Sequence, residues 1–391
     1  MDNYSGYSTR IINLVKGLEA SGNNVSVILP KYRAGYKLLD GIPVYELNGL
    51  CPKFLLKLVG RFCNIAKPSA LYFFDVLFLF RASQLVRNAD IVQMELPALS
   101  VLLSSFIHRT LRKPVVMDCH DVFAALRLKH VFPRRIAETF LEKVALKNAD
   151  FLVVVSKKEK QILGYLRFPW EKIVVAPNGV NIASFSKPAD LEVIRKKYKL
   201  DDSRVIVFVG NLGYEPNRQA VELISKTIAP RVKQEFSDTK FLIVGKIRDK
   251  MDLPGVTFTG FVDNVADLLA VSDVGIAPLL EGSGTRLKIL EYLSSGLPVV
   301  STSVGAEGLR AENGNNILIE DKIEKFGVHI IELLKDSEWS LAMGEAAKEL
   351  AANYDWKKIT KKLDYEYRSF LKKFRTNSEL TERTAIEKVK A

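Results

Sequence analysis

The chain has 391 residues, of which 48% are hydrophobic and 26% charged, a balance typical of a globular and not of a disordered protein. Its three cysteines, Cys51, Cys63 and Cys119, show no paired spacing, which argues against a disulfide framework or a zinc site and favours a reducing cytoplasm. The sequence predicts neither a secretory leader nor a membrane-spanning helix, since no uncharged apolar run is long enough.

The net charge of +12 is concentrated in the first half of the chain. Residues 1–185 carry 25 Lys and Arg against 14 Asp and Glu, whereas residues 186–391 carry 32 against 31. Residues 43–85 also mix apolar and basic side chains, as in a segment that lies on a membrane interface. Because no nucleic-acid-binding motif is present, the sequence favours an anionic membrane surface as partner, on the inner face of the plasma membrane. The alternatives are an ordinary solvated basic surface and a helix packed on its own domain.

Short apolar runs alternate with amphipathic stretches along the chain, which implies an α/β fold with two parallel sheets. Helices are predicted at residues 5–20, 98–112, 136–146, 266–270, 286–295, 327–352 and from 354 to about 374. Strands are predicted near residues 25–29, 90–94, 114–118, 151–155, 173–176, 205–209, 241–245, 256–260, 274–279 and from 299. The polar residues from 376 predict a disordered tail.

His120 follows a predicted buried strand, at the end of the strand where ligands gather in open parallel sheets. Asp118 and Asp121 flank it and are candidates to orient its ring. The alternative is a structural histidine with acids that cap the loop.

The stretch at residues 272–302 reads as a strand, a glycine-bearing loop, a helix and a strand. The loop ends in a predicted N-cap, Thr285, and the helix ends at Gly296. A helix N-terminus attracts anions, and Arg286 and Lys288 add cations where the helix dipole alone would favour acids. This pattern indicates a bound phosphate.

Lys288 and Glu291 are three residues apart and share one helix face. A carboxylate in this position can accept both hydroxyls of a ribose while the lysine meets phosphate. The alternative is a solvated surface pair, which is common on helices.

Together with Pro298-Val299-Val300, this stretch resembles the nucleotide-sugar site of the retaining glycosyltransferases of family 4 (glycosyl transferases group 1). The family pattern is Glu-Gly-x-Gly, a helix with a Glu, then Ala/Gly-x-Pro-Val-Val. The resemblance extends from residue 5 to about 374 and implies the GT-B fold, two Rossmann-like parallel-sheet domains facing across a cleft. It implies an N-terminal acceptor-side domain at 1–185 whose first strand is missing, a nucleotide-sugar domain at 186–360, a helix at 361–375 that crosses back, and a polar tail at 376–391.

The resemblance also implies roles for single residues. Glu291 matches the glutamate that binds ribose, and His120 matches a histidine near the donor sugar. Glu281 lies two residues further from Glu291 than the family spacing. Asn211 stands where the family has a cation, so the diphosphate charge falls to Arg286 and Lys288. The implied catalytic residues are His120, Glu281, Arg286 and Lys288, and the implied ligand-binding residues are Gly210, Asn211, Gly282, Ser283, Gly284, Thr285 and Glu291.

The implied function is transfer of a hexose from a UDP- or GDP-sugar to a glycan or lipid-linked acceptor, with retention of configuration, in cell-surface polysaccharide or glycoconjugate synthesis. No metal is expected, because the chain has no Asp-x-Asp motif. The alternatives are a non-catalytic nucleotide-sugar-binding scaffold at the membrane and a nucleotide-sugar epimerase of the same fold. A nicotinamide dehydrogenase is disfavoured, because no Gly-x-Gly-x-x-Gly follows a strand.

Overall fold

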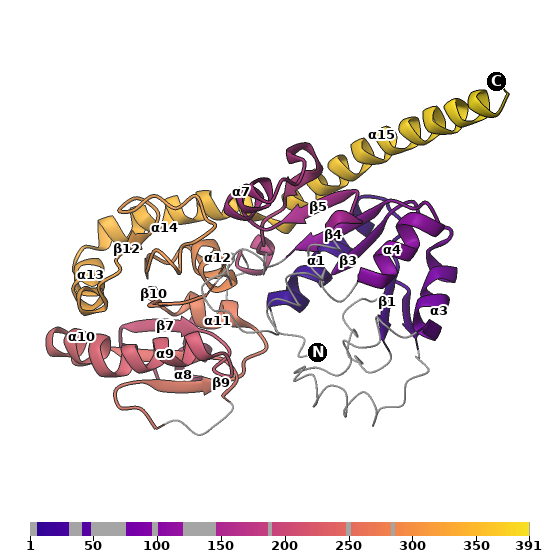
Figure 1. The fold of residues 1–391 in the computed structure, drawn as a ribbon. Helices are drawn as coiled ribbons and strands as arrows, with labels where there is room; N and C mark the ends of the chain where they lie inside the picture. The colour runs from indigo at the N-terminus through magenta and orange to yellow at the C-terminus, as the bar shows by residue number, and fades with distance from the viewer. Residues whose placement is uncertain are drawn as a thin grey trace, which may run out of the picture. The chain divides into compact units, whose positions relative to one another are not determined.

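A computed structural model of the protein describes residues 6–30, 41–47, 76–95, 101–119, 146–186, 190–247, 252–282 and 286–390. The chain divides into two compact units (Figure 1): unit 1 comprises Met1–Pro177 and Ile359–Ala391, and unit 2 comprises Asn178–Lys358. Each unit contains parallel β-sheet with helices packed on it, so the predicted α/β class is confirmed. The boundary predicted at residue 185 falls inside unit 2.

Unit 1 contains a four-stranded parallel sheet in the order β3-β4-β5-β6 and a parallel pair, β1-β2. The two central strands are buried along their length, which explains why they read as continuous apolar runs. The strands are β1 (Val27–Pro30), β2 (Val44–Leu47), β3 (Val92–Glu95), β4 (Val115–Cys119), β5 (Phe151–Val154) and β6 (Ile173–Val175). The helices are α1 (Gly6–Ala20), α3 (Val76–Val86), α4 (Val101–Thr110), α7 (Lys157–Tyr165) and the short 3₁₀ turn η3 (Trp170–Lys172).

The last helix of the chain, α15 (Trp356–Lys390), completes unit 1 from Ile359 onward. Its Phe370 ring stacks on Phe151 of β5 with 5.1 Å between ring centroids, and Tyr367 donates a hydrogen bond to Gln93 of β3 at 2.6 Å. The predicted disordered tail is wrong, because α15 continues to Lys390 (Figure 1). The reason is composition: the segment beyond residue 376 contains Glu, Leu, Ala, Lys and Arg, which are polar but good helix formers, and it contains neither Gly nor Pro.

Unit 2 is built on a six-stranded parallel sheet in the order β12-β11-β10-β7-β8-β9. The strands are β7 (Val205–Val209), β8 (Lys240–Val244), β9 (Thr257–Gly260), β10 (Val274–Ala277), β11 (Val299–Ser301) and β12 (Leu318–Ile319). The chain therefore runs outwards from β7 through β8 to β9, then returns to the other side of β7 and continues through β10 to β12. This doubly wound order places helices on both faces of the sheet (Figure 1).

One helical layer of unit 2 packs α13 against α10 and η5, and the other packs α12 against α11 and α14. The helices are α8 (Leu191–Lys197), α9 (Glu215–Leu223), the π-helical turn η5 (Ile224–Ile228), α10 (Ala229–Glu235), α11 (Val265–Ala270), α12 (Leu287–Ser295), α13 (Ile323–Lys335) and α14 (Ser337–Ala351), with 3₁₀ turns η4 (Ile182–Ser184) and η6 (Ala352–Tyr354). The single helix predicted at 327–352 is thus two helices. They separate at Asp336, whose side chain caps α14 by accepting a hydrogen bond from the Trp339 amide.

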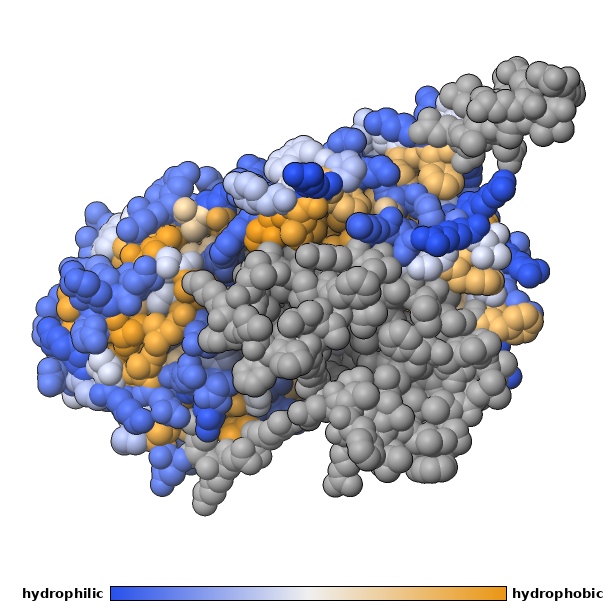
Figure 2. Space-filling view, in the orientation of Figure 1, coloured by the Kyte–Doolittle hydropathy of each residue, from blue (hydrophilic) through white to orange (hydrophobic). Residues whose placement is uncertain are grey.

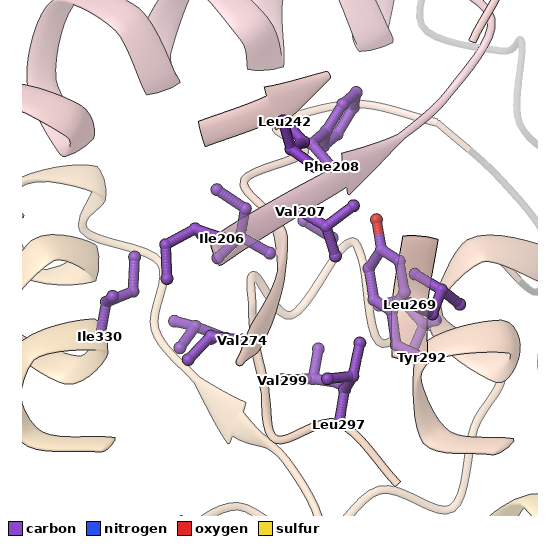
Figure 3. Close-up of a cluster of buried hydrophobic side chains, with 14 of the residues drawn as sticks. Ile206, Val207, Phe208, Leu242, Leu269, Val274, Tyr292, Leu297, Val299 and Ile330 are labelled. Carbon is purple, nitrogen blue, oxygen red and sulfur yellow. The ribbon is translucent and has the colours of Figure 1, made fainter. Parts of the chain in front are cut away.

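A buried cluster of aliphatic and aromatic side chains holds unit 2 together. Figure 3 shows Tyr292 of α12 among apolar residues that include Val207, Leu269 and Leu297. Hydrophilic residues cover much of the described surface in Figure 2. Among the described residues, no helix combines the length and the apolar character that a membrane span requires.

Candidate functional site

The site predicted from sequence lies at the topological switch point of the unit 2 sheet. β7 and β10 are neighbours in the sheet, but the chain leaves them toward opposite edges. The loops that follow such strands diverge and leave a crevice at their carboxyl ends, which is where open α/β sheets bind ligands. These two loops contain Gly210 and Asn211 after β7, and Glu281 and Gly282 after β10.

The loop after β7 is a tight turn closed by asparagine. The side-chain oxygen of Asn211 accepts a hydrogen bond from the Gly213 amide at 2.9 Å, and its backbone carbonyl accepts one from the Asn217 side chain at 2.9 Å. The following helix α9 begins at Glu215. Asn211 therefore shapes the turn. At this position the resembled family has a cation that binds phosphate, so the role of Asn211 is a different one.

The loop after β10 brings a guanidinium group against a glycine. Gly282 has φ +133°, and a Cβ built there would lie 2.4 Å from Arg286 Nη2, so a larger residue would displace that guanidinium. Arg286 occupies the N-cap position of α12, and the predicted helix start at this residue is one residue early. Ser283, Gly284 and the predicted cap Thr285 lie outside the described residues. The other end of α12 is as predicted, because Gly296 adopts the left-handed conformation at φ 74°.

Lys288, in the first turn of α12, reaches the end of β7. Its Nζ donates a hydrogen bond to Asn217 Oδ1 at 2.8 Å and lies 3.9 Å from the centroid of the Phe208 ring. The pKa of Lys288 is lowered to about 7, mainly by burial and also by the neighbouring charge of Arg286, whereas the charge of Glu291 opposes the shift. An anion placed beside this lysine would raise its pKa again, so the site is prepared to gain charge on ligand binding.

Glu291 lies one turn further along α12. Burial raises the pKa of its carboxyl to about 7, and the charge of Lys288 opposes this shift. Both Lys288 and Glu291 are half-buried, so the alternative of a solvated surface pair does not describe them. A half-buried carboxyl that costs stability when ionised is a candidate for ligand contact.

Replacing Glu291 with glutamine should stabilise the ligand-free protein at pH 8 by about 1–3 kcal/mol, because the variant removes a half-buried charge. The folded-state pKa of about 7 exceeds the ordinary value of 4.5, so the stability from this group is fully present below pH 4.5 and is lost as the pH rises through 7. The gain should therefore shrink between pH 8 and pH 5, as measured by urea unfolding. Glu349→Gln, on the exposed face of α14, is the matched control. An equal gain at both pH values would contradict ionisation as the cause.

Tyr292 fixes α12 on the sheet and is a residue that the sequence pattern did not single out. Its hydroxyl accepts a hydrogen bond from the Val209 amide at 2.7 Å, and its ring lies where a Cβ on Gly275 would be, at 2.7 Å. A tyrosine amid apolar helix residues gives no signal of such a contact. Because Tyr292 contacts both strands, it holds Lys288 and Glu291 of the same helix in a fixed position relative to β7 and β10.

Unit 1 contains a fully buried ion pair between Arg10 and Asp118. Arg10 of α1 donates to both carboxylate oxygens of Asp118 at 2.9 and 2.8 Å, and also to the carbonyl oxygen of Ala176 at 2.9 Å. The sequence pattern suggested Asp118 as a partner for His120 and gave no indication of Arg10. His120 and Asp121 lie outside the described residues, and Glu281 is exposed.

Both halves of the chain match known protein families. Family models described as "Glycosyltransferase Family 4" and "Glycosyl transferases group 1" match residues 4–184 and 203–336. A phosphatidyl-myo-inositol mannosyltransferase of Mycolicibacterium smegmatis is 26% identical over 48% of the chain and 49% of its own length. The sulfoquinovosyl transferase SQD2 of Arabidopsis thaliana is 24% identical over 93% of the chain and 70% of its own length. The chain spans about half the length of the first curated relatives it matches, 45% and 49%.

Solved structures share the fold. Anabaena HepE, crystallised with UDP, superposes with a TM-score of 0.71 at 16% identity, covering 92% of this chain and 96% of its own. This likeness confirms the predicted GT-B architecture. With both halves of the chain matched, the protein belongs to the glycosyltransferases of family 4, the group 1 glycosyl transferases of GT-B fold.

Proposed function

We propose that the protein transfers a hexose from a nucleoside-diphosphate sugar to a glycan or lipid-linked acceptor, with retention of configuration, in cell-surface polysaccharide or glycoconjugate synthesis. The observation that carries the proposal is the placement of Lys288 and Arg286 at the start of α12, next to the carboxyl ends of β7 and β10. Two cations at a helix N-terminus beside a switch point suit a diphosphate. HepE, which has the same fold, is known with UDP and with UDP-glucose.

In the proposed mechanism the donor diphosphate lies against Arg286 and Lys288, and Glu291 accepts the ribose hydroxyls. As the bond between the sugar and the diphosphate breaks, negative charge grows on the leaving phosphate, and fixed cations lower the barrier by stabilising that charge. The acceptor oxygen forms its bond to the sugar on the same face, and its proton passes to the leaving phosphate. His120 and Glu281 are proposed to contact the donor sugar, and no catalytic metal is proposed.

The test of this proposal is a thermal unfolding series with UDP-, GDP- and ADP-sugars in the presence of EDTA. A ligand that binds the folded state alone at 100 times its Kd stabilises the protein by about 2.7 kcal/mol, so one donor should raise the midpoint selectively. That donor is then used with candidate acceptors, and the anomeric configuration of the product is read by nuclear magnetic resonance. Failure of all donors to shift the midpoint of the folded protein would contradict the proposal and favour a membrane scaffold.

We also propose that unit 1 associates with an anionic membrane surface through its basic excess. Binding to vesicles that contain an anionic lipid should decrease several-fold between about 50 mM and 500 mM salt, because salt screens charges beyond the Debye length. Vesicles of neutral lipid are the control and should bind weakly at both salt concentrations. Binding that resists salt would instead indicate apolar insertion.

A further inference from the structure

We propose that Asn217 is a positioning residue of the diphosphate site, whose side-chain amide joins the loop after β7 to Lys288 and sets where the lysine ammonium is presented. This inference rests on the proposed function, to which it adds a neutral residue. Asn217 acts through Lys288 and has no proposed contact of its own with the donor.

The hydrogen bonds of Asn217 fix its amide at both ends. Asn217 is on the first turn of α9 and is 8% exposed. Its Nδ2 donates to the carbonyl oxygen of Asn211 at 2.9 Å, and its Oδ1 accepts from Lys288 Nζ at 2.8 Å. A carbonyl cannot donate and an ammonium cannot accept, so the two partners specify one orientation of the amide. The lysine is thereby tied to the turn after β7.

The packing around the ammonium leaves it little freedom. A Cβ built on Gly210 would lie 2.9 Å from Asn217 Cγ and 3.0 Å from Lys288 Nζ, so a larger residue at this strand end would displace one of the two side chains. The Phe208 ring covers another side at 3.9 Å from its centroid. β7, α9 and α12 therefore define the position of one nitrogen atom, although they are separate in sequence.

The neutrality of Asn217 matters for binding an anion. An aspartate in place of Asn217 would pair with Lys288 and reduce the attraction of this lysine for phosphate. A lysine in place of Asn217 would repel the Lys288 ammonium. Within the described ranges, the charged groups that act on Lys288 are Arg286 and Glu291, and the pKa of the lysine is lowered to about 7, mainly by burial. The neutral acceptor Asn217 favours the ammonium form of Lys288 modestly. It does not neutralise the charge of the lysine, which stays available to attract the ligand.

The first experiment measures the pH dependence of Lys288 acetylation in the ligand-free protein by mass spectrometry. Asn217→Leu removes the acceptor at similar volume and should lower the midpoint, since the charged form loses a hydrogen bond. Asn217→Asp should raise the midpoint by about one pH unit or more, because it places a carboxylate beside the ammonium. Asn264→Leu, which removes the N-cap of α11, is the matched control and should leave the midpoint unchanged. Midpoints that are the same in all four proteins would overturn the inference.

The second experiment compares the affinities for UDP and uridine at pH 7. Asn217→Leu should weaken UDP binding by about tenfold and leave uridine binding unchanged, because only UDP uses the positioned ammonium. Equal losses for UDP and uridine would indicate a general packing defect and overturn the inference. A wild-type protein that binds no UDP would contradict the proposed function, whereas the acetylation midpoints would still decide the link between Asn217 and Lys288.

Discussion

Replacing Arg286 and Lys288 together with alanine is expected to weaken UDP binding by about 100-fold or more and to leave uridine binding nearly unchanged. Hydrogen bonds that involve a charged group contribute roughly 1.5–3 kcal/mol each, and two of them account for a factor of this size. These cations recognise the diphosphate of the ligand. Uridine has no diphosphate, so its affinity should not change when the cations are removed. Isothermal titration calorimetry with both ligands measures the ratio directly.

The matched control removes two exposed cations that belong to α9 and η5 of unit 2. Arg218 and Lys226 are exposed and pair with Glu215 and Glu222 on their own helical segment. The double variant Arg218→Ala, Lys226→Ala changes the net charge equally but leaves the start of α12 intact. A similar loss of UDP affinity in this control would mean that long-range attraction, and not the proposed contacts, explains the effect.

Replacing Glu291 with alanine is expected to weaken UDP binding at least about tenfold, because a carboxylate that accepts two ribose hydroxyls is lost. The dideoxy analogue of UDP, which lacks both hydroxyls, should lose much less affinity than UDP, its remaining loss coming from Lys288, whose pKa falls further when the opposing charge of Glu291 is removed. Glu349→Ala is the control for removal of a helix glutamate. An equal loss for UDP and for the dideoxy analogue would exclude the ribose role.

The pH dependence of UDP binding gives an independent check on Glu291. Binding requires Glu291 ionised and Lys288 protonated, and both groups have a pKa of about 7 in the ligand-free protein. Affinity in the wild type should therefore pass through a maximum near pH 7. In Glu291→Ala the decline on the acidic side should become smaller, leaving what protonation of the terminal phosphate of UDP contributes below about pH 6, whereas the alkaline decline that belongs to Lys288 should persist.

The sequence predicted most of unit 2 because its signals are local. The strand at 205–209 is a continuous apolar run, and the end of α12 follows from the need for a left-handed residue, which Gly296 supplies. Arg286, Lys288 and Glu291 could be named as candidates because three chemically informative side chains occur within six residues at the start of one helix. The carboxyl ends of β7 and β10 could be predicted to meet only by resemblance, since strand order is a tertiary property.

The sequence did not reveal the roles of Asn217 and Arg10, because these roles depend on contacts between segments that are distant along the chain. Asn217 and Lys288 are separated by 71 residues, and Arg10 and Asp118 by 108. A lone asparagine near a helix start reads as a cap, and a lone arginine on an amphipathic helix reads as a surface residue. The split of the predicted helix 327–352 had a local signal, the Asp336 cap, and hydrophobic periodicity alone did not reveal it.

The two stretches that form unit 1 have a consequence for biosynthesis. Met1–Pro177 leaves the ribosome first, but β3 and β5 receive their contacts with Tyr367 and Phe370 only when α15 has been made. Unit 2 is one continuous stretch, Asn178–Lys358, and is complete earlier. The nascent chain therefore completes unit 2 before unit 1. Until α15 has been made, the apolar surface of Met1–Pro177 that α15 later covers stays exposed. During this period chaperones protect a chain from aggregation.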